Sequence, residues 1–189
     1  MELAAVDKLR SLGVIFVDVE LPKLPWGAME LLLEAESAAA FDDLTMLGRD
    51  KLLTGQGPDD YPNNFRVSRF YPAIEYIQAN RARSLAIQQV SGLFEKVDII
   101  VGSTFYEDQA TATNLTGHPA LIIPIGVRGS DAPPAIEFPD QGPNSGLAGP
   151  GTPHSITFLA GHYQDAKLLA FGRAFQEATG FHKLHPKLG

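Results

Sequence analysis

The chain has 189 residues, no cysteine and a formal net charge of −7. This length, with a hydrophobic content of 44%, suits one globular unit with one sizeable core. The lack of cysteine excludes disulfides, thiolate nucleophiles and thiolate metal sites. The 15 Lys and Arg residues are scattered, so the sequence offers no electrostatic footprint for a phosphate backbone, and we expect no direct nucleic-acid contact.

The sequence also argues against a membrane span. The longest apolar run, Ala120 to Val127, is too short to cross a bilayer and is interrupted by Pro124. The first residues carry Glu2 and Asp7 where a signal peptide would have a basic start. A signal peptide on an upstream segment would not be visible in this sequence. The sequence therefore leaves the cellular compartment unassigned, with the cytoplasm slightly favoured.

The first half of the chain shows two helical patterns, one predicted strand and one predicted loop. Apolar residues recur at helical spacing over residues 3–12, and Gly13 is a C-terminal helix stop. The run Val14–Val19 predicts a buried strand. Residues 26–47 show a helical pattern, and residues 55–64 concentrate turn formers, which predicts a surface loop.

The second half reads as an α/β layer. A helix is predicted from Pro72 to about Glu95, followed by strands over Val97–Val101, Ala120–Ile125 and Ser155–Ala160 and by a helix over residues 165–179. The first two strands are apolar at almost every position, as in strands covered on both faces. The predicted fold class is therefore α/β, with a mixed β-sheet covered by helices on both faces.

One long connection is expected inside this fold. Residues 127–153 are rich in Gly and Pro and show no periodicity, so they predict an extended loop. Because the strand that follows still needs a sheet, this loop lies within the domain and is not a linker between domains. We therefore predict that residues 1–189 form a single region.

The polar residues of this sequence form no complete catalytic or metal-binding motif. A Ser103–His118–Asp98 triad can be written down, but the sequence around Ser103 lacks the second glycine of a nucleophile elbow, and a structural turn explains it better. His182 and His185 have no third ligand, so no metal site is predicted. No Gly-rich phosphate loop is present, and we expect no cofactor.

Two segments carry a family resemblance. Residues 113–126 read TNLTGHPALIIPIG, a polar turn that runs into an apolar strand and stops at Pro and Gly. Residues 153–162 read PHSITFLAGH, and the helix over 165–179 follows. This order of elements resembles the C-terminal portion of the amidase signature hydrolases, and the resemblance extends over almost the whole chain.

The resemblance implies a partial domain. The family's catalytic Lys and Ser pair would lie upstream of these segments, so no catalytic residue is assigned here and the isolated chain is expected to be inactive. The strand end and the polar turn would border the substrate cavity, which makes Ser103, Thr104, Asn114 and Thr116 the substrate-binding candidates. For the last two, a structural turn is the competing interpretation.

Three functions follow from this interpretation. The first is the C-terminal part of an amidase that acts on carbon–nitrogen bonds of a small amide, completed by an N-terminal segment or a partner chain. The second is a stand-alone, non-catalytic binding or assembly domain, and the third is part of the amidase subunit of a tRNA amidotransferase. Because a partial sheet exposes an edge and an apolar face, self-association is also expected.

Overall fold

The computed structural model describes residues 1–104, 108–136 and 148–185. These residues form two compact units, which are described separately. The first unit is drawn from residues 1–20, 93–110 and 118–189, and the second from residues 21–92 and 111–117.

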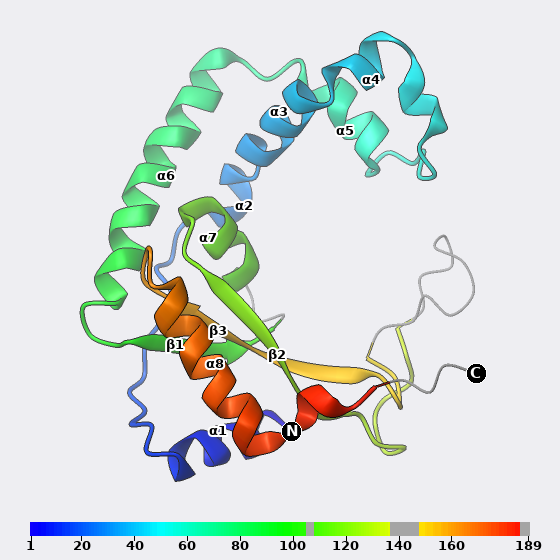
Figure 1. The fold of residues 1–189 in the computed structure, drawn as a ribbon. Helices are drawn as coiled ribbons and strands as arrows, with labels where there is room; N and C mark the ends of the chain where they lie inside the picture. Colours follow the sequence, from blue (N-terminus) through cyan, green and yellow to red (C-terminus); the bar gives the residue numbers. More distant parts are fainter. Residues whose placement is uncertain (105–107, 137–147, 186–189) are drawn as a thin grey trace. The chain divides into compact units, whose positions relative to one another are not determined.

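The first unit contains a three-stranded sheet (Figure 1). The strands are β1 (Ile99–Ser103), β2 (Ala120–Val127) and β3 (Pro153–Ala160). Their order is β1-β3-β2, and both pairings are antiparallel. The last strand in the chain is thus the central strand, and the α/β class predicted from the sequence is confirmed.

Two helices accompany this sheet, α1 (Glu2–Ser11) and α8 (Asp165–Thr179). Their apolar residues and one face of the strands form a single core, whose buried members are Ala5, Leu9, Ile123, Ile125, Ile156, Phe158, Ala160, Leu168 and Phe175. Phe158 meets the rings of Phe171 and Phe175 edge to face, at centroid distances of 5.0 and 5.7 Å. Such contacts add to the energy of area burial.

The second unit is helical. Its helices are α2 (Trp26–Met29), α3 (Leu31–Ala40), α4 (Asp42–Met46), the 3-10 helix η1 (Arg49–Leu52), α5 (Tyr61–Ser68) and α6 (Ala73–Leu93). Helix α7 (Gln109–Thr116) begins in the first unit and continues in the second. A second 3-10 helix, η3 (Phe181–Lys183), follows α8 in the first unit.

The strand predicted at Val14–Val19 was wrong. These residues form neither a helix nor a strand, and they pair with no strand in the described part of the chain. Val14 and Phe16 pack against the core, whereas Ile15 and Val17 are exposed. This alternation of packed and exposed side chains is typical of a strand. The segment has, however, no hydrogen-bonded neighbouring strand among the described residues.

The helical pattern over residues 26–47 is correct but is interrupted. The backbone leaves helical geometry at Phe41, whose ring stacks on Phe65 at 5.6 Å. The loop predicted over residues 55–64 is too long, because α5 begins at Tyr61 with Pro62 in its first turn.

The structure also refines the predictions for the turn before β2, for β2 and for the loop that follows it. The turn before β2 is the end of helix α7, closed by Gly117 at a φ of 73°. β2 is not covered on both faces throughout, since Ile122 is 59% exposed. The middle of the predicted 127–153 loop, residues 137–147, lies outside the described residues.

We predict that Phe158→Ala lowers the free energy of unfolding by about 3–5 kcal/mol, because it leaves a cavity between two rings in the centre of the core. Leu169→Ala is the matched control: this side chain on α8 is exposed, and the expected change is within about 0.5 kcal/mol. Urea unfolding followed by circular dichroism measures both. Equal losses in the two variants would contradict this core.

Candidate functional site

A chain of hydroxyl groups lies on the sheet face opposite Phe158. The Thr157 hydroxyl donates to Oγ1 of Thr104 at 3.2 Å, and Thr104 and Ser155 share a hydrogen bond of 3.0 Å. Ser155 and Thr157 alternate with the core residues of β3 and therefore point to the other face. The cluster provides both donors and acceptors, which is what binding of an amide group requires.

The end of β1 next to this cluster is held by Gln109. Its amide donates to the carbonyl oxygen of Ser103 at 3.1 Å, and the side chain is buried. A Cβ at Gly102 would lie 2.1 Å from Oε1 of Gln109, so only glycine allows this approach. Of the sequence-predicted candidates, the structure thus brings Ser103 and Thr104 to one strand end.

The Ser103–His118–Asp98 triad is not assembled. Asp98 precedes β1 and Ser103 ends it, which separates them by about 16 Å along the strand. His118 lies two residues before β2, whose first residue pairs with Leu159, so it lies at the Asp98 end of the sheet. Asp98 itself accepts a hydrogen bond from Lys167 at 3.0 Å.

His118 instead belongs to a stack of rings. It lies between Phe94, at a centroid distance of 5.3 Å, and His162, at 3.8 Å. Burial, together with the neighbouring His162, lowers the pKa of His118 from 6.5 to about 4. The ring is therefore neutral at physiological pH.

The other two candidates lie in the second unit. Asn114 is exposed on α7. Thr116 is buried, and its hydroxyl donates to the carbonyl oxygen of Ala112 at 2.7 Å. This bond to the preceding turn of its own helix is a structural role.

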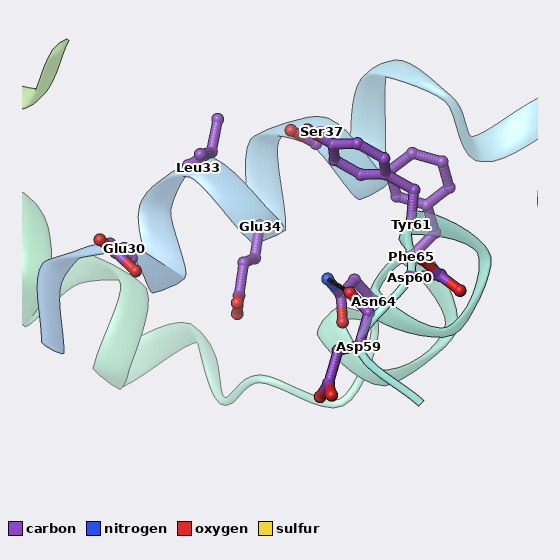
Figure 2. A pocket seen from close by; sticks show the side chains of 9 residues that line it. All are labelled: Glu30, Leu33, Glu34, Ser37, Asp59, Asp60, Tyr61, Asn64 and Phe65. Atoms are coloured by element: carbon purple, nitrogen blue, oxygen red, sulfur yellow. Dashed lines mark hydrogen bonds between the residues drawn. The ribbon is translucent and has the colours of Figure 1, made fainter. Parts of the chain in front are cut away.

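The second unit contains an acidic pocket of about 360 Å³ between α3 and α5 (Figure 2). Its carboxylates come from Glu30, Glu34, Asp59 and Asp60. Glu34 accepts a hydrogen bond from the Tyr71 hydroxyl, which raises the pKa of Tyr71. Glu30 accepts a hydrogen bond from the Thr111 hydroxyl on α7, and Asp60 accepts one from the backbone amide of Gly57 in the loop before α5.

Two features are absent from the described residues. No group of three or more His, Cys, Asp or Glu side chains is arranged to hold a metal ion. No helix in the same residues has the length and apolar character needed to cross a membrane.

The sequence reasoning missed Ser155, Thr157 and Gln109. The signal for the first two was the alternation of hydroxyl and apolar residues along β3, which separates one face from the other. Gln109 carried no signal, because its role depends on a close approach to Gly102 that no sequence pattern marks.

No family model matches the sequence. Among curated proteins, the chain is similar to a subunit of glutamyl-tRNA(Gln) amidotransferase from Bacillus velezensis, with 27% identity over 98% of the chain and 42% of that protein. The corresponding subunit of Bacillus pumilus is 30% identical over 66% of the chain and 25% of the protein. The chain thus spans less than half the length of the relatives that it matches.

Solved structures agree on the fold. A bacterial aryl acylamidase of the amidase signature family superposes with a TM-score of 0.63 at 16% identity, over 95% of this chain and 40% of the other. Over the part that it spans, the chain has the fold of the amidase signature enzymes. A 6-aminohexanoate cyclic dimer hydrolase superposes with a TM-score of 0.68 at 14% identity, over 98% of this chain and 42% of the other. The coverage of this amidase-like chain fits the predicted C-terminal portion.

We predict that Thr157→Val destabilises the amidase-like chain by about 1–2 kcal/mol, because Thr104 loses the hydrogen bond that the buried Thr157 hydroxyl donates to it. Thr45→Val is the matched control. Its hydroxyl is buried without a hydrogen-bond partner among the described residues, so the same change is expected to be neutral or stabilising. The urea midpoints of the two variants measure the change in stability. A loss of stability in Thr45→Val as large as that in Thr157→Val would contradict the stabilising role of the Thr157 hydrogen bond.

We further predict that His118 makes the stability of the amidase-like chain depend on pH. Its folded pKa lies below the ordinary value, so the unfolded chain binds more protons between about pH 6.5 and pH 4. The stability that the neutral His118 ring contributes is complete above the unfolded pKa. It is lost as the pH falls towards the folded pKa, and the loss is about 3 kcal/mol at most.

Urea midpoints across this pH range measure the effect. His118→Phe keeps an aromatic ring in the stack and should flatten the slope, whereas His182→Phe, at an exposed position, should keep it. A slope in His118→Phe equal to that of the unaltered chain would show that other groups cause it.

Proposed function

We propose that this chain, residues 1–189, is a single region that forms the C-terminal part of an amide hydrolase. The observation that carries the proposal is the match of 98% of the chain to a glutamyl-tRNA(Gln) amidotransferase subunit, together with the amidase signature fold. The curated relative is named as a subunit of an amidotransferase. The solved structures are named as an aryl acylamidase and a 6-aminohexanoate cyclic dimer hydrolase. The substrate class proposed for the complete enzyme is therefore a small amide.

In this proposal the chain binds substrate and does not attack it. Amide hydrolysis needs a nucleophile, a base and oxyanion donors that act as a unit. Thr104 and Ser155 are partly exposed and share a hydrogen bond, and the buried Thr157 hydroxyl holds Thr104 in place, which suits the first two to positioning a polar group. Ser103 would border the same site. The attacking groups would come from a further segment or from a partner chain.

Part of a tRNA amidotransferase is the second candidate function. The curated relatives carry this name, and their identity to the chain exceeds that of the solved amidases. The net charge of −7 and the scattered Lys and Arg residues give no particular support to direct tRNA binding, so in this candidate function any RNA contact would belong to another subunit. A stand-alone binding or assembly domain is the alternative without catalysis.

The proposal predicts that the purified chain releases no ammonia from amides, because the nucleophile and base are supplied elsewhere. Sequencing of the genomic region upstream of Met1 is expected to find a segment with a Lys followed by a Gly/Ser-rich stretch. Co-expression of that segment with the chain should then release ammonia from glutamine or benzamide, measured by a coupled ammonia assay.

Controls separate the three functions. Thr104→Val in the co-expressed pair should raise the KM or lower kcat, while Leu169→Ala should leave both unchanged. Hydrolysis of glutamine alone among the amides would favour the amidotransferase. Ammonia release by the isolated chain would contradict the division of roles, and an upstream region that lacks the segment would favour the stand-alone domain.

A further inference from the structure

The hydrogen bonds of the hydroxyl cluster at the end of β1 run in one direction. Thr157 is buried, so its O–H needs an acceptor inside the protein, and it donates to Oγ1 of Thr104 at 3.2 Å. Thr104 shares a further hydrogen bond of 3.0 Å with Ser155, in which either hydroxyl can be the donor. Thr104 and Ser155 are both partly exposed. The hydrogen bonds therefore lead from the buried end of the cluster to its exposed end.

A count of donors leaves one O–H at the exposed end. Three hydroxyl groups carry three donors, and the two hydrogen bonds among them use two. Whichever residue donates within the Thr104–Ser155 pair, one O–H of the pair has no acceptor among the described residues. Because Thr104 also accepts from Thr157, the linked bonds polarise this last donor and strengthen it. The cluster thus offers one directed O–H to a ligand that can accept it.

The groups bonded to this cluster are neutral. No charged side chain forms a hydrogen bond with the three hydroxyls in the described part of the chain. Gln109, which holds the carbonyl oxygen of Ser103 beside them, carries a neutral amide. A bound carboxylate is normally held by a cation or by several charge-assisted bonds. A single hydroxyl donor is better suited to a neutral acceptor, such as a carbonyl oxygen.

The charged groups next to the cluster in the sequence lie on the other face of the sheet. His154 precedes Ser155 on β3, and successive side chains of a strand point to opposite faces. The His154 ring is hydrogen-bonded to Arg128, and its Nε2 lies 3.4 Å from the Glu2 carboxylate. The Arg128 guanidinium is therefore held on the face opposite the hydroxyls.

We propose that the Thr104–Ser155 pair determines substrate specificity by donating one hydrogen bond to a neutral acceptor of the substrate, and that Thr157 positions this donor. The substrate class is a small uncharged amide that carries a second neutral acceptor away from the bond that is cleaved, such as the other carbonyl oxygen of a diamide. This inference rests on the proposed function, because the attacking groups come from a further segment or a partner chain.

Three amides of similar length test this specificity in the co-expressed pair. Glutaramide carries a second neutral carbonyl group, pentanamide has a methyl group in its place, and glutaramate has a carboxylate there. After correction for the two equivalent amides of glutaramide, its kcat/KM is expected to exceed that of pentanamide roughly tenfold. Glutaramate is expected to be no better than pentanamide. A coupled ammonia assay measures all three initial rates.

Paired variants separate the hydroxyl groups from the shape of the site. The double variant Thr104→Val/Ser155→Ala removes both possible donors, so the preference for glutaramide over pentanamide should disappear. The double variant Thr104→Ser/Ser155→Thr keeps both hydroxyls and should retain the preference. Circular dichroism should show both variants folded, because the two side chains are partly exposed.

Thr157 is tested as a positioning residue through the same ratio of kcat/KM values. Thr157→Val should lower the preference for glutaramide roughly two- to threefold, because Thr104 no longer accepts a bond that orients and polarises it. Thr157→Ser keeps the hydroxyl and should restore the preference. A merely structural role would lower the activity towards all three amides equally and leave the ratio unchanged.

Binding to the purified chain separates this inference from the proposed function. Glutaramide, and not pentanamide, is expected to shift the NMR signals of the backbone amides of residues 104, 155 and 157. Hydrolysis with equal kcat/KM for glutaramide and pentanamide, or with a preference that survives removal of both hydroxyls, would overturn this inference alone. Glutaramide-specific shifts without hydrolysis of any amide would overturn the proposed function and leave the donor site standing. Neither shifts nor hydrolysis would overturn both.

Discussion

The antiparallel pairing of β3 with both of its neighbours is the constraint on which the first unit depends. β3 is buried along its second half, and its register places Phe158 opposite Val101 on one side and Leu121 on the other. A shift of one residue would turn Phe158 out of the core and Thr157 into it. The core and the hydroxyl cluster therefore share one register, and the backbone ladder that fixes it also separates apolar from polar chemistry.

The same sheet explains why the chain resembles a part of something larger. Three strands with one face packed against α1 and α8 make a core, yet the described sheet ends at β1. Residues 14–17 line a groove with β1, and their apolar side chains are alternately packed on the core and exposed. Strand edges and apolar faces of this kind are normally paired or covered. The coverage of its relatives agrees, because the chain matches less than half of each.

The polar groups of the first unit gather at one strand end. Thr104, Ser155 and Thr157 form a connected set of hydroxyls, and Gln109 holds the strand end beside them. The strongly perturbed imidazole of His118 is stacked between rings at the other end of the sheet. Its low pKa reflects burial and a neighbouring histidine, which is a cost to stability in acid and not a sign of an assembled base.

Periodicity alone determined much of this protein: the helices α1, α6 and α8, the three strands and the α/β class. These are set by local spacing of apolar residues and by glycines such as Gly13 and Gly117, which end helices wherever the rest of the chain lies. The family resemblance came from two segments, residues 113–126 and 153–162. Tertiary structure decided that Val14–Val19 pairs with no strand among the described residues, that β3 is central, and that Ser155 and Thr157 meet Thr104. Those outcomes depend on which distant segments pair, and the energy of pairing and burial is shared between residues that no local pattern connects.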